Sequence, residues 1–202
     1  GWSFARAYLG GVLFSNSSAK GLVLSGAQLV NTSFRRVELE GADFSSVLVR
    51  HTKFEGPRVS SVKFHSGQFV DYDFSGIELD EDDFTGANLE GAQFSEASLK
   101  GANLEGANLA RVNFEGMDLQ GMNFRGVYLE RSVFTGANLS GACLERAKVS
   151  GANFSGANLA KVSMRQASGD GASFKRAALV DTDASGANLS HANLFEASIQ
   201  RS

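Results

Sequence analysis

Large apolar residues recur at every fifth position along the chain. From Phe4 to Ile199 this series has 40 members without an insertion or deletion, of which 15 are Phe and 17 are Leu. The residue two places before each of these centres is small and most often Ala, the residue directly before it is polar, and Gly is the commonest residue two places after it. An α-helix repeats its face every 3.6 residues and a strand every 2, so neither explains a period of five.

A short extended segment followed by a corner does explain this period. In an extended segment the centre and the small residue two places before it share one face, so both can point inward while the polar residue between them points outward. Gly at the last position suits a type II turn, because the third residue of that turn has a positive φ. Each pentapeptide is therefore predicted to form one side and one corner of a polygon.

A slower period indicates how many sides the polygon has. When the centres are sorted by every fourth repeat, the column that starts at Phe14 has nine successive Phe residues, whereas the column that starts at Ala19 has none. The column that starts at Phe4 lies opposite the first one and has five Phe residues. This sorting favours a square coil of 20 residues and about ten coils in all. With neighbouring strands about 4.8 Å apart, the rod would be about 48 Å long.

Charged and amide side chains repeat in the same 20-residue register. Basic residues stand one coil away from acidic ones, and Asn stands one coil away from Asn. Cross-strand pairs of this kind contribute roughly 0.2–1 kcal/mol each. The predicted pairs are Lys53–Asp73, Arg58–Glu78, Lys63–Asp83, Asn88–Asn108, Asn103–Asn123 and Asn138–Asn158.

The small inward residue is replaced repeatedly between residues 47 and 83. We therefore expect the coils there to bulge or to change turn type, whereas residues 84–159 follow the pattern almost without exception. The replacing residues are Thr52, Pro57, Gly67, Tyr72, Ile77 and Asp82.

Runs such as Ala87-Asn88-Leu89-Glu90-Gly91 and Ala102-Asn103-Leu104-Glu105-Gly106 resemble the pentapeptide-repeat family, whose motif is A(D/N)LXX. The resemblance covers essentially the whole chain. It implies an all-β fold, a right-handed quadrilateral β-helix of about ten coils without inserted loops. The family includes quinolone-resistance proteins that resemble DNA and bind gyrase, as well as many proteins without a known activity. Fold and activity separate readily, so the resemblance implies less about function.

An acidic belt is the main candidate for a partner-binding surface. Nine Asp and Glu residues lie between Asp71 and Glu96, and no Lys or Arg lies between Lys63 and Lys100. Such a belt could attract a basic partner surface, or its acids could simply answer the basic residues one coil away. The candidate partner-binding residues are Asp71, Asp80, Glu81, Asp83, Glu90 and Glu96.

A DNA-mimicking protein that binds DNA gyrase or another topoisomerase is the alternative function. A mimic of the phosphate backbone would need one side of the rod to be acidic along its length. The four sides carry net charges of −1, 0, 0 and −2, so mimicry would depend on the acidic belt alone.

No group of residues predicts catalysis, a cofactor or a metal ion. The three His residues are scattered, and Cys143 faces outward without a His in register. The glycines open no helix, so no phosphate-binding loop is predicted. Asp80–Asp83 lacks the spacing of a calcium loop, and Asp82 points inward, where we expect backbone donors or water to satisfy it. The chain is therefore predicted not to be an enzyme.

The ends of a β-helix leave backbone groups unpaired, which is a template for association. Phe195 is the one Phe outside the fivefold series, and we expect it to face outward on the last coil. It is the candidate contact of an end-to-end homodimer. Because the pattern is already running at Trp2 and no initiator Met is present, residues 1–202 are expected to be a single domain that belongs to a longer chain.

Composition narrows the function further. The 202 residues include 19 Lys and Arg against 22 Asp and Glu, and the net charge of −3 argues against direct nucleic-acid binding. No run of 18 apolar residues and no signal-peptide pattern is present, so membrane insertion is not expected and the cytoplasm is the favoured compartment. The predicted function is a non-catalytic rod that presents a rigid surface to a protein partner.

Overall fold

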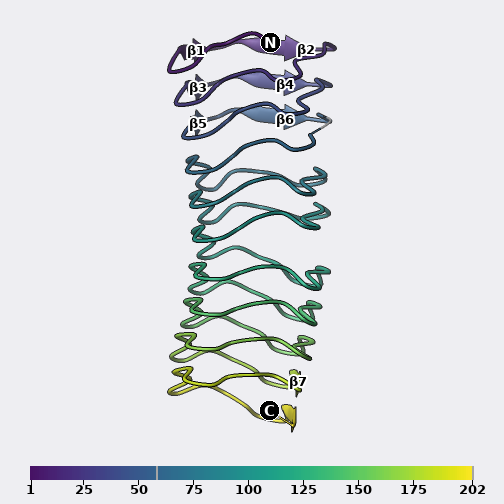
Figure 1. Cartoon of the computed structure of the whole chain (residues 1–202), viewed down its shortest axis with the longest axis vertical. Coiled ribbons are helices and arrows are strands. Elements are labelled where there is room, and N and C mark those ends of the chain that lie inside the picture. The colour runs from purple at the N-terminus through teal and green to yellow at the C-terminus, as the bar shows by residue number, and fades with distance from the viewer. Residues whose placement is uncertain (58, 202) are drawn as a thin grey trace.

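The chain winds into a four-sided rod whose coils stack along one axis, with the two termini at opposite ends (Figure 1). A computed structural model describes residues 1–57 and 59–201. Cα partners in neighbouring coils are 20 residues apart, as in the series Phe14, Phe34 and Phe54. The rod has about ten coils, which confirms the predicted square coil.

Segments regular enough to count as strands lie near the two ends of the rod (Figure 1). Parallel pairing joins them in the orders β1-β3-β5, β2-β4-β6 and β7-β8. Elsewhere single parallel bridges join neighbouring coils. No helix is present among the described residues, and so none of sufficient length and apolarity to cross a membrane. The strands are β1 (Tyr8–Gly10), β2 (Leu13–Ser15), β3 (Gln28–Val30), β4 (Ser33–Arg35), β5 (Leu48–Arg50), β6 (Lys53–Glu55), β7 (Ala178–Val180) and β8 (Ser198–Gln200).

Every corner of the rod uses the left-handed backbone region. All described residues with a positive φ, glycine or not, lie two places after a centre, from Arg6 (φ 59°) to Arg201 (φ 51°). Along most of the rod the corner is closed by a hydrogen bond from the backbone N–H three places after the centre to the centre's carbonyl. Between Gly67 and Ala177 these N···O distances are 2.9–3.3 Å. The prediction of a positive-φ turn at each corner is confirmed.

Several corners in the first coils are open instead. Among the described residues, this closing hydrogen bond is missing after Leu9, Leu29 and Val49, and after their neighbours Phe14, Phe34, Phe54 and Val59. Threonine hydroxyls compensate in part, because Thr32 Oγ1 donates to the Leu9 carbonyl at 2.8 Å and Thr52 Oγ1 donates to the Leu29 carbonyl at 2.9 Å.

The predicted change of turn type between residues 47 and 83 is therefore correct only as far as residue 62. The corners that follow Phe64, Phe69, Phe74 and Leu79 are closed normally, although their inward residues are atypical. The open corners also begin much earlier in the chain than we expected, at Leu9.

The core is a continuous stack of inward side chains. Along the Phe14 column, successive rings lie nearly parallel, with centroid distances of 4.8 Å for Phe14–Phe34 and 4.9 Å for Phe114–Phe134. Such ring pairs contribute about 0.5–1.5 kcal/mol beyond the area they bury. The stack is interrupted once, where the Tyr72 ring lies between its neighbours, 5.9 Å from Phe54 and 4.7 Å from Phe74.

Candidate functional site

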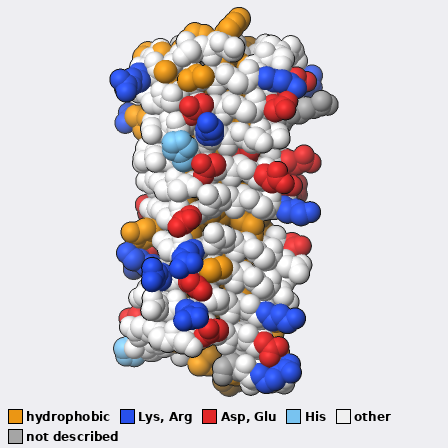
Figure 2. Space-filling model, viewed as in Figure 1, with side chains coloured by type: hydrophobic (Ala, Val, Ile, Leu, Met, Phe, Trp, Pro, Cys, Tyr) orange, Lys and Arg blue, Asp and Glu red, His pale blue; other side chains and the backbone are white. Residues whose placement is uncertain are grey.

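The acidic belt comprises the nine acids between residues 71 and 96, and it lies between two more basic stretches. Residues 1–63 contain eight Lys and Arg against four Asp and Glu, and residues 64–99 contain no base at all. Figure 2 shows acidic side chains gathered in the upper half of one face, with basic ones above and below them. All members of the belt except Asp82 are at least partly exposed. The belt members are Asp71, Asp73, Glu78, Asp80, Glu81, Asp82, Asp83, Glu90 and Glu96.

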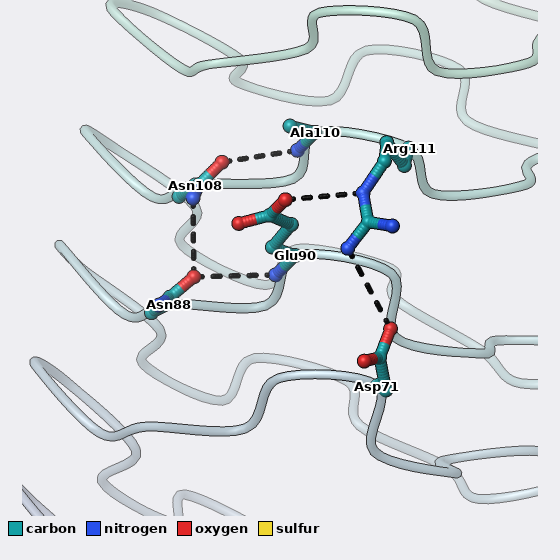
Figure 3. A network of polar contacts seen from close by, with 6 residues as sticks. All are labelled: Asp71, Asn88, Glu90, Asn108, Ala110 and Arg111. Atoms are coloured by element: carbon teal, nitrogen blue, oxygen red, sulfur yellow. Dashed lines mark hydrogen bonds and ion pairs between the residues drawn. The ribbon is translucent and has the colours of Figure 1, made fainter.

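Arg111 ties two of these acids together from the coils beyond (Figure 3). Its Nε lies 3.0 Å from Glu90 Oε1, and its Nη2 lies 3.8 Å from Asp71 Oδ1. Asp71 reaches across a whole coil to make this contact, because Gly91 lies between them without a side chain. The sequence analysis did not find this network, since it compared residues only one coil apart.

Other belt carboxylates are bound to backbone and hydroxyl groups. Asp80 Oδ1 accepts from the Lys100 backbone N–H at 2.9 Å and from the Ser98 hydroxyl. Asp73 Oδ1 accepts from the Ser75 N–H at 2.9 Å, and hydrogen bonds from the Ser75 side chain and backbone lower the pKa of Asp73. Asp83 Oδ1 binds the Thr85 N–H at 3.0 Å in the same way. Within the described residues, Glu78, Glu81 and Glu96 have no ion-pair or side-chain hydrogen-bond partner.

The predicted charge pairs directly before the centres are wrong as ion pairs. Lys63 and Asp83 are backbone neighbours, but neither they nor Lys53 and Asp73 form an ion pair among the described residues, and Arg58 lies outside those residues. The carboxylate at this position instead turns back to its own corner. Ion pairs one coil apart form between corner residues, whose side chains project freely: Lys20–Glu40 (2.6 Å), Arg35–Glu55 (3.6 Å), Arg125–Glu145 (3.3 Å) and Arg176–Glu196 (2.5 Å).

Two of the three predicted amide pairs are confirmed. Asn108 Nδ2 donates to Asn88 Oδ1 at 3.1 Å, and Asn158 Nδ2 donates to Asn138 Oδ1 at 3.1 Å. The third pair, Asn103–Asn123, does not form in the described structure.

Two buried polar groups lie beneath the belt. Asp82 is fully buried; its Oδ1 accepts the Val62 backbone N–H at 2.8 Å, as expected for an inward acid, and its Oδ2 has no partner in the described structure. Burial raises the pKa of Asp82 to about 7, the Val62 hydrogen bond opposes the rise and Asp80 adds to it. Burial also raises the pKa of Tyr72, whose hydroxyl lies beside the Phe54 backbone without a hydrogen bond of good geometry.

The other candidate residues are placed as follows. Cys143 is half-buried and pairs by its backbone with Asn123 and Ser163. His191 Nδ1 lies 2.8 Å from Asp170 Oδ1. Phe195 is 57% exposed on the last coil, where Lys175 Nζ lies 5.6 Å from its ring centroid. No group of three or more His, Cys, Asp or Glu that could hold a metal ion occurs within residues 1–57 and 59–201.

The ladder between coils is interrupted in two places. In the described structure, no backbone hydrogen bond joins residues 51–57 to residues 70–76, and none joins residues 96–104 to residues 115–123. Both interruptions lie where two successive inward positions carry residues larger than Val: Tyr72 with Ile77, and Met117 with Met122. The Phe94–Phe114 ring distance is correspondingly stretched to 5.9 Å, and the Asn103–Asn123 pair is lost at the second interruption.

The interruption at Met117 and Met122 contradicts the expectation that residues 84–159 are nearly ideal. The signal was present in the sequence as two successive large side chains where Ala is usual. An open groove marks each interruption. The one at residues 96–122, here called the methionine groove, is lined by Glu96, Ala97, Ser98, Leu99, Lys100, Glu115, Gly116, Met117, Asp118, Gln120 and Met122.

The fold and its repeat define a quadrilateral β-helical solenoid of the right-handed kind. The family model described as pentapeptide repeats matches residues 7–45, 20–56, 78–116, 116–151, 150–183 and 172–202. The chain therefore belongs to the pentapeptide-repeat family. The unmatched stretch, residues 57–77, includes Tyr72 and the first interruption of the ladder.

Solved structures of the same kind resemble the chain. HetL, a pentapeptide repeat protein involved in heterocyst differentiation regulation from the cyanobacterium Nostoc sp. strain PCC 7120, is 28% identical over 96% of this chain and 88% of its own, with a TM-score of 0.32. Rfr23 from the cyanobacterium Cyanothece 51142 is 22% identical over 62% of this chain and 90% of its own, with a TM-score of 0.41. QnrB1, a plasmid-mediated fluoroquinolone resistance protein, is 14% identical over 92% of this chain and 90% of its own, with a TM-score of 0.32. Among curated proteins, nothing matches the chain.

Proposed function

We propose that this chain is a non-catalytic module that presents a rigid surface to a protein partner, and that the acidic belt is the contact. The observation that carries the proposal is the segregation of charge, with nine acids and no base within residues 64–99. A belt of one sign on a rigid surface steers a partner of opposite charge and fixes its orientation. A basic protein surface is therefore the partner that fits.

The members of the belt without a partner in the described structure provide the most direct test. Neutralising Glu78 and Glu81 (Glu78→Gln with Glu81→Gln) removes two free charges and no hydrogen bond found in the structure. Glu105→Gln with Glu130→Gln makes the same change of charge outside the belt and is the matched control. Proteins captured on wild type and on both variants would be compared by quantitative mass spectrometry, and a candidate would then be purified and titrated.

The expected result is a partner that binds wild type and the control alike and loses at least about tenfold in affinity with the belt variant. Its affinity should also fall with added salt, because exposed charges are screened. Equal binding of all three proteins would refute the role of the belt. A change in gyrase supercoiling that depends on Asp71, Glu81 and Glu90 would instead support DNA mimicry. The pairing of Asp71 and Glu90 with Arg111 speaks against mimicry, since it places a base among the acids.

The proposed contact between two rods uses the last coil. Phe195 (57% exposed), Leu194 (42%) and Ile199 (54%) form an apolar surface there. We expect light scattering to give the mass of a dimer for the wild-type chain and of a monomer for Phe195→Asp. A wild-type monomer would exclude this contact.

A further inference from the structure

We propose that the methionine groove binds an extended, basic segment of a partner protein, with the main chain of that segment paired to the open edges of the two coils. This inference rests on the proposed function and names a second contact with its chemistry. Three features of the groove carry it: unpaired backbone, an apolar floor and an acidic rim.

The backbone on both edges of the groove lacks its usual partners. One coil further on, the same ladder positions are bonded, with Leu119 N 2.8 Å from the Asn138 carbonyl and Asn138 N 2.9 Å from the Met117 carbonyl. The equivalent bonds between Leu99 and Asp118 are missing in the described structure. Unpaired N–H and C=O groups at a strand edge are what an added peptide strand binds.

The floor of the groove is apolar and adaptable. Met117 and Met122 lie on one coil, and Leu99 and Ala97 lie on the other. Met122 and Leu99 are nearly buried, with 4% and 3% of their surfaces exposed, whereas Met117 and Ala97 are more open. Flexible thioether side chains adjust to different ligands more easily than branched ones do. Alternate side chains of an extended peptide point to one face, so one set can rest on this floor.

The rim gives the groove its preference for basic residues. Glu96, Glu115 and Asp118 are exposed along it, against one base, Lys100. Within the described residues, Glu96 and Glu115 have no ion-pair partner. The other side chains of a bound strand would face this rim, and Lys or Arg there would complement its charge.

The other interruption of the ladder lacks these features. Its rim mixes Arg50 and Lys53 with Glu55, Asp71 and Asp73, so it offers no preferred sign of charge. The Tyr72 ring already occupies the space between Phe54 and Phe74. The methionine groove is therefore the opening that fits a basic strand.

The test uses a fluorescein-labelled peptide of eight alternating Lys and Val residues, titrated by fluorescence anisotropy against the whole chain. Two further peptides separate the causes of binding. The first replaces each Lys by Glu, and the second carries N-methyl groups on alternate amides and so keeps the charge but cannot pair its main chain. We expect binding of the Lys–Val peptide, and at least tenfold weaker binding of both others.

The matched protein variant is Met117→Ala with Met122→Ala, which restores the usual inward residue and lets the two coils pair. It should lose at least tenfold in affinity for the Lys–Val peptide. Val112→Ala with Val127→Ala truncates the neighbouring inward residues, where the ladder is intact, and should bind as wild type does. Glu115→Gln with Asp118→Asn should weaken binding about fivefold and reduce its dependence on salt.

Hydrogen–deuterium exchange keeps the proposal testable even if a variant folds poorly. On wild type, the Lys–Val peptide should slow amide exchange in residues 96–104 and 115–123. No slowing there, or equal affinity for the N-methylated peptide, would overturn the proposal. The two proposals fail separately: a native partner lost with the Glu78 and Glu81 variant but retained by the Met117 and Met122 variant supports the belt and rejects the groove for that partner.

Discussion

The side chains of Asp71 and Arg111 meet across two coils of the rod, 40 residues apart in the sequence, and the contact passes over Gly91. Asp71 Oδ1 and Arg111 Nη2 are 3.8 Å apart, and Arg111 is held in place by Glu90 at 3.0 Å (Figure 3). A side chain at position 91 would overlap the Asp71 carboxylate. The belt is thus connected to the more basic coils that follow it by a single arginine.

Replacing Gly91 by Ala is expected to break this connection. At φ 68° an L-residue costs about 1–2 kcal/mol, and the new Cβ would also push Asp71 away from Arg111. Gly141→Ala is the matched control, because Gly141 has φ 70° and nothing within 4 Å of an added Cβ. Urea unfolding should show a slightly greater loss for Gly91→Ala, by at most about 1 kcal/mol for an exposed ion pair. The excess should vanish in 1 M salt; an excess that persists would mean that packing rather than charge is lost.

Replacing Tyr72 by Phe is expected to stabilise the protein. The hydroxyl of Tyr72 is buried without a hydrogen bond of good geometry, and leaving such a group buried costs about 1–3 kcal/mol. Tyr72→Phe keeps the ring between Phe54 and Phe74 and should raise the free energy of unfolding by about 1 kcal/mol. Tyr128→Phe is the control, because Tyr128 is 41% exposed and should change little. A loss of stability for Tyr72→Phe would show that the hydroxyl does bind the nearby Phe54 backbone.

The fold was predictable because the fivefold repeat leaves few alternatives. A centre such as Phe34 and a small residue such as Ala42 must both point inward, and the Phe14 column fixes the coil at 20 residues. What the repeat could not give is how each polar side chain chooses among nearby partners. Asp73 and Asp83 bind their own corners because an N–H two residues away is closer and better oriented than a lysine on the next coil.

The candidate site was less predictable, for a related reason. Comparison at a spacing of 20 residues finds Asn88 with Asn108 but misses Asp71 with Arg111, which are 40 residues apart. The methionine groove depends on the combined bulk of Met117 and Met122 rather than on either alone. Leu22, a single large inward residue, leaves the bridge between Ser3 and Val23 intact.

Replacing Thr52 by Val is expected to cost about 1 kcal/mol, because Val fills the same space and removes one hydrogen bond. Thr52 is buried, and its Oγ1 donates to the Leu29 carbonyl at 2.9 Å beside an open corner. Thr52→Ser keeps the hydroxyl and should recover much of the loss in urea unfolding. If Val and Ser variants are equally unstable, the methyl group rather than the hydrogen bond holds this corner.

Replacing Asp82 by Asn is expected to remove a dependence of stability on pH. In the folded rod, burial raises the pKa of Asp82 to about 7 from an ordinary value of 3.8. The folded state therefore holds the proton more tightly than the unfolded state does. Its stabilising effect is fully present below about pH 4 and is lost as the pH rises toward 7, by a few kcal/mol at most.

Thermal unfolding measured from pH 4 to pH 8 would show this loss in the wild-type chain. Asp82→Asn should flatten the profile and be more stable than wild type at pH 8, because its amide oxygen can still accept the Val62 N–H without a buried charge. Glu81→Gln, an exposed neighbouring acid, should leave the slope unchanged and serves as the control. A wild-type slope that survives in Asp82→Asn would assign the titration to another group.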